Sequence, residues 1–187
     1  MSERNTVLRS LHDLGLAAWF GGTLANAVAL NAAAGAVDRP TERGRAANVG
    51  WDRWTPVNLA AIGAHLVGAS GLLAANADRV RSQRGVGASS AVKTGLTVAA
   101  LGLTAYSRVL GRKVDQAGDV PVASGAKPDA TTPPEVAKAQ EQLRSLQWAI
   151  PGVTGALIVV TALQGEQQRA DQVLKGVPQR LVAKVGR

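Results

Sequence analysis

The chain contains no cysteine, so a disulfide framework, a thiolate metal site and a cysteine nucleophile are all excluded. Its single methionine is the initiator Met1, which leaves almost no soft sulfur ligand for copper or haem. Aromatic residues make up only 3% of the chain, and it has only two histidines, His12 and His65. GxSxG, Walker and zinc-binding motifs are also missing. We therefore expect neither an enzyme nor a metal site.

Charged residues are absent from three long stretches, residues 14–37, 54–77 and 145–165. A helix needs about 20 apolar residues to cross the hydrocarbon core of a bilayer, and each stretch is long enough. A fourth uncharged stretch, 94–107, is shorter. It spans a bilayer if the basic side chains that flank it extend to opposite interfaces, whereas a re-entrant or surface helix would need no such extension.

These stretches predict an all-α protein, a bundle of four transmembrane helices. We expect its membrane domain to cover residues 1–170 and a basic cytoplasmic tail to cover 171–187. A cleavable signal peptide is the alternative for the first span, but His12 and Asp13 would interrupt it. The expected spans are 12–36, 55–77, 90–110 and 145–165.

The formal net charge of +8 would suggest nucleic acid as the partner of a soluble protein. Here the basic residues lie between the apolar stretches, where they can anchor to anionic headgroups. We therefore expect a lipid bilayer and no nucleic acid as the partner, with a homo-oligomer or a larger membrane complex as the assembly. A dense basic cluster at Arg79, Arg81 and Arg84 places both termini in the cytoplasm of a multi-pass cell-membrane protein.

The connecting segments are predicted from their composition. Residues 38–53 mix proline, glycine and charge, and we expect a loop at the membrane surface before a helix that starts at Thr55–Pro56. Residues 112–134 are rich in proline and polar side chains, so they predict a mobile extramembrane loop without a core. The tail is either a basic amphipathic helix on the membrane surface or a solvated segment.

Small and amide side chains recur at helical spacing within the predicted spans. Small residues on one stripe let helix backbones approach closely, and amides inside hydrocarbon form hydrogen bonds between helices. We therefore assign a helix-packing role to the following set: Gly22, Asn26, Ala64, Gly68, Gly152 and Ala156.

His65 is the candidate cofactor-binding residue, because it lies near the predicted bilayer centre. One interpretation is a neutral histidine that forms a hydrogen bond with Thr23 or Asn26. The other is a proton relay or a ligand of haem or quinone, although the sequence predicts no cofactor by itself. With the second span starting near Trp54, His12 and His65 would differ in height by about 21 Å at 1.5 Å per residue. One chain would then not bring both to the same haem.

The segment Leu11-His12-Asp13-Leu14-Gly15-Leu16-Ala17-Ala18-Trp19-Phe20-Gly21-Gly22 resembles the first helix of copper-resistance-D-like and DUF4149 membrane proteins. That resemblance implies a four-helix membrane fold and metal or redox accessory roles. This chain departs from copper-handling proteins because it lacks cysteine and internal methionine. The composition also resembles that of uncharacterised actinobacterial four-helix membrane proteins.

Three functions follow as hypotheses. The first is a structural or accessory subunit that packs through its small-residue helix faces. The second is a redox subunit that binds haem or quinone near His65. The third is a small transporter-like module in which His65, Asn26 and Asn58 line a polar path.

Overall fold

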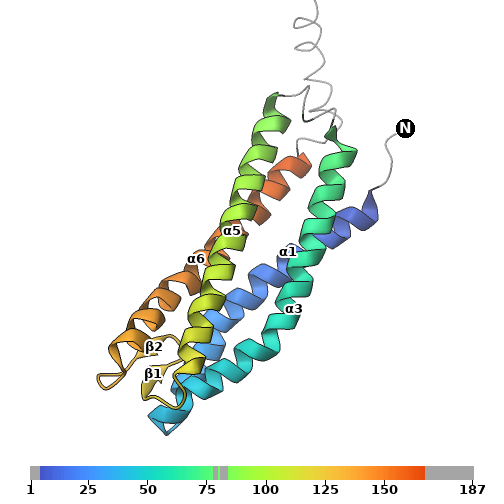
Figure 1. Ribbon diagram of the computed structural model, residues 1–187. Coiled ribbons are helices and arrows are strands. Elements are labelled where there is room, and N and C mark those ends of the chain that lie inside the picture. Colours follow the sequence, from blue (N-terminus) through green and yellow to red (C-terminus); the bar gives the residue numbers. More distant parts are fainter. Residues whose placement is uncertain (1–4, 78–79, 81–83, 167–187) are drawn as a thin grey trace, which may run out of the picture.

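The computed structural model describes residues 5–77, 80 and 84–166, and the tail from 171 lies outside the described residues. Four long helices form a bundle, and consecutive helices run in opposite directions (Figure 1). All four are long and apolar enough to cross a membrane. Large apolar side chains such as Leu59, Val98 and Leu163 face outward, as expected for surfaces in contact with lipid. The predicted all-α four-helix fold is confirmed.

The first helical rod consists of α1 (Thr6–Ala25), a π-helical turn η1 (Asn26–Leu30) and α2 (Asn31–Gly35). The residues at both junctions keep right-handed helical dihedrals, so the three pieces form one continuous rod. A π-turn inserts one extra residue into the helical register and shifts the faces that follow it. In this chain Asn31 and Ala34, which follow the π-turn, are buried in the protein interior.

The next helix, α3, covers Pro40–Ala75, so the predicted surface loop at 38–53 is wrong. Proline at the first helical position and Glu42 in the first turn both favour a helix start there. Pro56 lies inside the helix, where it removes only one backbone hydrogen bond. The early turns stay helical because they pack against the first rod: Ala47 is buried, and the side chain of Leu30 lies directly against Gly50.

The α1 and α3 helices pack closely along their length. An added Cβ at Gly15 would lie 2.5 Å from the backbone nitrogen of His65, and one at Gly68 would lie 2.8 Å from the Cα of His12. Both distances are far below normal van der Waals contact. Glycine at these two positions therefore sets how closely the backbones of the two helices approach.

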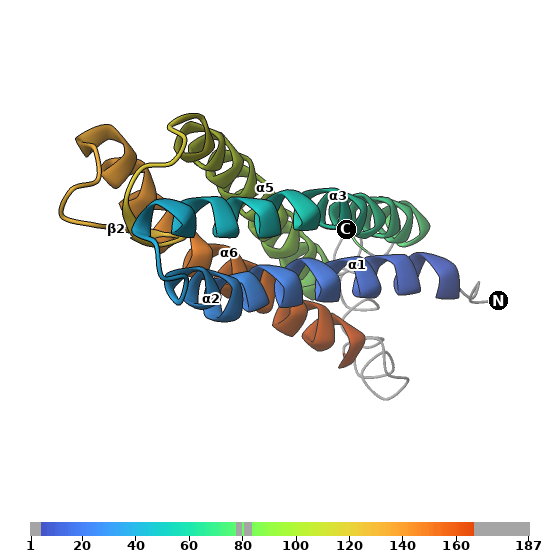
Figure 2. The ribbon, with the colours of Figure 1, turned by 90° about the horizontal axis from the view of Figure 1, so that it is seen from below.

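The second pair consists of α5 (Arg84–Gln116) and α6 (Pro134–Glu166), both longer than the predicted spans. Side-chain hydrogen bonds join the pair near both ends, from Gln164 to Ser89 and from Tyr106 to Gln142. Figure 2 views the bundle along a different direction and shows α5 crossing α3 obliquely, while α1 and α3 run side by side. Hydrogen bonds from Asn31 to Gln147 and from Asn48 to Asp115 join the two pairs.

The segment between α5 and α6 contains a short antiparallel hairpin, β1 (Val122–Ser124) and β2 (Lys127–Pro128). It was expected to be mobile and without a core, and that expectation is wrong. Val122 has no exposed surface, and the hydroxyl of buried Thr132 donates a hydrogen bond to the carbonyl of Pro121. The loop has few apolar residues of its own, but α3 and α2 contact β1, which contains Val122, and α6 contacts β2.

Candidate functional site

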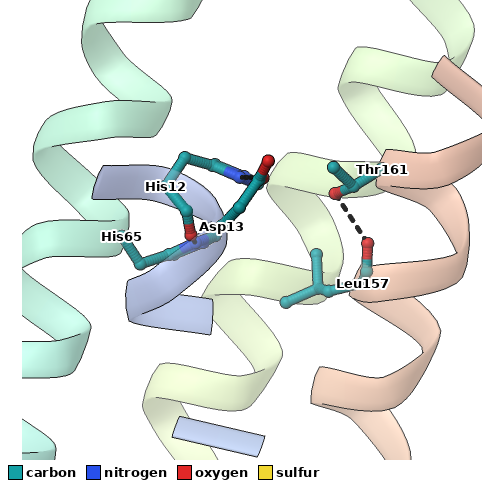
Figure 3. Close-up of polar contacts among 5 residues, drawn as sticks. All are labelled: His12, Asp13, His65, Leu157 and Thr161. Atoms are coloured by element: carbon teal, nitrogen blue, oxygen red, sulfur yellow. Dashed lines mark hydrogen bonds and ion pairs between the residues drawn. The ribbon is translucent and has the colours of Figure 1, made fainter. Parts of the chain in front are cut away.

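A compact polar cluster lies inside the bundle near the ends of α1 and α3 (Figure 3). The His12 and His65 rings have centroids 4.5 Å apart, and neither side chain is exposed. Nδ1 of His12 donates to a carboxylate oxygen of Asp13 at 2.6 Å, and Nδ1 of His65 donates to the carbonyl of His12 at 3.3 Å. Trp19 packs edge-on against His65. Both Nε2 atoms lack a hydrogen-bond partner.

This proximity corrects the expected 21 Å difference in height between the two histidines. The error came from placing the helix start at Thr55, when α3 begins at Pro40. With the turn at residues 36–39, His12 and His65 lie at matching distances from it along the two antiparallel helices. His65 also has neither of the predicted partners Thr23 and Asn26.

One cavity of about 670 Å³ begins at the histidine cluster and extends to the end of the bundle where α1 starts and α6 ends. We call it the histidine-side cavity. Its charged lining residues are Arg9, Asp13 and Lys93, while Leu16 and Leu101 lie at its inner limit. The hydroxyl of Thr161, also in the lining, donates to the carbonyl of Leu157 within its own helix (Figure 3).

A second cavity of about 410 Å³ lies in the opposite half of the bundle, next to the hairpin, and we call it the hairpin-side cavity. Its mouth carries the ion pair between Arg108 and Asp52 at 3.8 Å and the hydrogen bond from Asn48 to Asp115 at 2.9 Å. Its neutral polar lining residues come from all four long helices. They are Thr23, Asn31, Asn48, Thr55, Asn58, Thr104, Ser107 and Gln147.

An apolar layer separates the two cavities. Its buried core consists of five side chains, with further leucines packed against them. Leu16 also lines the histidine-side cavity, Ile62 lines the hairpin-side cavity, and Leu101 lines both. The two cavities therefore approach each other from opposite ends of the bundle and stop at the same leucine. The five core residues are Leu16, Trp19, Ile62, Ala100 and Leu157.

The predicted helix-packing residues have different surroundings. Gly22 and Gly68 contact the partner helix within the chain, Gly22 against the ring of Trp54 and Gly68 against the backbone at His12. Gly152 is exposed, and an added Cβ there would meet no other atom within 4 Å. Asn26, Ala64 and Ala156 are half-buried.

Sequence reasoning missed several residues of the hairpin-side cavity. Asn31 donates from its amide nitrogen to Gln147 at 2.5 Å, which links the first rod to α6. Thr104 lies on α5 with a buried hydroxyl that has no partner. Each is an isolated polar residue in an uncharged stretch, and that position was the one sign in the sequence of a polar site inside the bundle. Their convergence depends on helix rotation, and the sequence does not show it.

Comparisons with protein families, with curated proteins and with solved structures found no match. The resemblance of the first helix to copper-resistance-D-like and DUF4149 proteins therefore stays a prediction. Within the described residues, no three histidine, aspartate or glutamate side chains lie together as a metal site.

Proposed function

We propose that this protein is a small membrane transport module that passes a small polar solute between its two cavities. One observation supports the proposal: the cavities reach inward from opposite ends of the bundle and share Leu101 at their inner limits. A closed apolar layer between two cavities that open at opposite ends is what a carrier or channel needs in order to block free leakage.

In this proposal both termini lie in the cytoplasm. The start of α1 and the end of α6 lie at the same end of the bundle (Figure 1). The end of α3 and the start of α5 lie at that end as well. The sequence between these two helices carries the basic cluster, and the positive-inside rule favours the cytoplasm for it. The histidine-side cavity then opens toward the cytoplasm and the hairpin-side cavity toward the outside.

A flux measurement tests the proposal. Liposomes that contain the purified protein are mixed with erythritol, a neutral polar probe, and the recovery of their volume is followed by light scattering. We expect faster recovery than in protein-free liposomes, and still faster recovery with Leu101→Ala, which thins the apolar layer. Leu163→Ala removes an outward-facing leucine of the same size and should leave the rate unchanged. Rates equal to those of protein-free liposomes for all three proteins would contradict the proposal.

A structural or accessory role is the second candidate, and outward-facing glycines favour it. An added Cβ at Gly95, Gly102 or Gly152 would meet nothing within 4 Å, so these positions can accept a neighbouring helix. Gly22 and Gly68 are used inside the chain and do not serve this purpose. Gly102→Leu should then reduce the oligomer size in detergent without loss of folding, and an unchanged size would argue against assembly through this face.

The redox alternative has less support. The His65 ring is fully buried between His12 and Trp19 and lines neither of the two cavities, so a haem would have to displace this packing. A quinone at His65 meets the same obstacle. We therefore propose no cofactor for the histidine cluster.

A further inference from the structure

Four residues of the hairpin-side cavity each carry a buried polar atom without a hydrogen-bond partner. The four residues line the cavity, and the unpartnered atoms are Oδ1 of Asn31, Oδ1 of Asn58, Nε1 of Trp54 and Oγ1 of Thr104. Each atom has almost no accessible surface of its own, so its side chain must rotate to present it to the cavity. Asn31 is only 6% exposed. Buried polar atoms almost always have partners, so four unpartnered atoms around one cavity indicate that something outside the chain satisfies them.

The other hydroxyl groups of the lining do not supply the missing partners. Thr23 donates to the carbonyl of Trp19, and Thr55 donates to the carbonyl of Trp51, each one turn back in its own helix. Ser107 is likewise bonded to a backbone carbonyl of its own helix. These hydroxyl groups therefore leave the four atoms without partners, and rotation of the side chains can present them to a molecule inside the cavity.

The charge of the lining favours a neutral molecule. The charged lining residues are two carboxylates, Asp52 and Asp115, and two guanidinium groups, Arg108 and Arg112, which sum to zero. Arg108 is paired with Asp52, and Asp115 accepts a hydrogen bond from Asn48. No excess charge is therefore left to attract an ion.

We propose that the hairpin-side cavity binds a neutral small molecule that carries hydroxyl groups on an apolar ring or chain. A hydroxyl donates and accepts hydrogen bonds, so it can donate to the amide oxygens of Asn31 and Asn58 and accept from the indole N–H of Trp54. Leu59, Ile62 and other apolar side chains of the lining cover the apolar part. A volume of about 410 Å³ suits such a ligand.

Two sources in a membrane share this chemistry, a diphenol such as a hydroquinone and the glycerol headgroup of a neutral lipid. The inference goes beyond the proposed transport, because the molecule would be bound whether or not it crosses the apolar layer. A protein that binds the probe without erythritol flux would contradict transport alone. Flux without probe binding would contradict this inference alone.

The experiment measures the thermal unfolding midpoint of the full chain in micelles as probe concentration rises, since a ligand of the folded state raises the midpoint. The probes are decylhydroquinone, its dimethyl ether, and monodecanoylglycerol. We expect decylhydroquinone or monodecanoylglycerol to raise the midpoint, which identifies the source, and the dimethyl ether to have no effect because it lacks donors.

Substitutions of lining residues test whether the probe binds in the hairpin-side cavity. Asn58→Leu should weaken the apparent affinity by about tenfold, which corresponds to the loss of one good buried hydrogen bond. Asn26→Leu removes an amide that lines neither cavity and should bind as the wild type does. If Asn58→Leu does not fold, Thr104→Val removes another partner with almost no change of shape.

Equal effects of decylhydroquinone and its dimethyl ether, with no change in either variant, would show partition into the micelle and overturn the inference. An unfolding midpoint that neither decylhydroquinone nor monodecanoylglycerol raises would also overturn the inference, because water would then satisfy the unpartnered polar atoms of the cavity.

Discussion

Gly68 should be the position on α3 where an added methyl group costs the most. An added Cβ at Gly68 would lie 2.5 Å from the carbonyl oxygen of Leu8 and 2.8 Å from the Cα of His12. Both are backbone atoms of α1, which cannot rotate away as a side chain can. Because favourable carbon contacts lie at about 3.5–4.0 Å, the two helices would have to separate by about 1 Å.

The expected magnitude combines two opposing effects. Overpacking of a well-packed site costs about 1–3 kcal/mol, and the rigid backbone contacts place Gly68→Ala at about 3 kcal/mol. Alanine regains about 0.5–1 kcal/mol over glycine in a helix, which leaves a net loss of about 2 kcal/mol. Gly63→Ala on the same helix meets no atom within 4 Å, so it should be neutral or more stable by up to about 1 kcal/mol.

The assay is equilibrium unfolding in mixed micelles with increasing dodecyl sulfate, followed by tryptophan fluorescence. We expect the two alanine variants to differ by about 3 kcal/mol in the free energy of unfolding, with Gly68→Ala the less stable. Equal stability of the two variants would refute the close approach of α1 and α3 at His12.

Three further predictions follow from particular contacts. Gln147→Leu should cost about 1 kcal/mol in the same unfolding assay, because it removes the acceptor of the buried Asn31 amide; no change would contradict that hydrogen bond. Val122→Asp should make the hairpin loop sensitive to a protease that leaves the wild-type loop intact, since it buries a charge where no surface is exposed; equal resistance would show that the loop is not packed. Hydrogen bonds from the backbone N–H and hydroxyl of Thr131 hold the pKa of Asp129 below its ordinary value of 3.8. The ionised carboxylate therefore stabilises the loop fully above pH 3.8, and this stabilisation is lost as the pH falls through the lower pKa of the folded state. The Thr131 amide resonance should therefore titrate with a midpoint below 3.8, and a midpoint at or above 3.8 would contradict these bonds.

The four-helix architecture could be predicted because uncharged stretches of spanning length carry a strong signal. The residues at which the helices start were harder to predict from the sequence. Thr55–Pro56 has the residues of a helix start, but α3 continues through it because the preceding turns pack on the first rod. Tertiary contacts outweigh local preference there, and the resulting shift moved His65 from an isolated position to contact with His12.

The cavities were harder to predict from the sequence than the helices were. Asn58 was predicted to line a polar path, and it does line the hairpin-side cavity. Asn26 lines neither cavity, whereas Asn31, which follows the π-turn that begins at Asn26, is buried and lines the hairpin-side cavity. Such a change of helical register leaves no mark in the spacing of apolar residues. Buried Val122 was missed for a related reason, since the surface that covers it comes from distant segments.

The central claim is that two cavities lie on opposite sides of the membrane with an apolar layer between them. The chain has no cysteine, so single cysteines can be introduced without background. Ser90 lines the histidine-side cavity and Ser107 the hairpin-side cavity, and Ser→Cys hardly changes size.

Ser90→Cys and Ser107→Cys are each treated with a membrane-impermeant thiol reagent added to one side of sealed vesicles at a time. We predict that Ser90→Cys reacts from the cytoplasmic side only and Ser107→Cys from the opposite side only. Reaction of both variants from the same side would contradict the account.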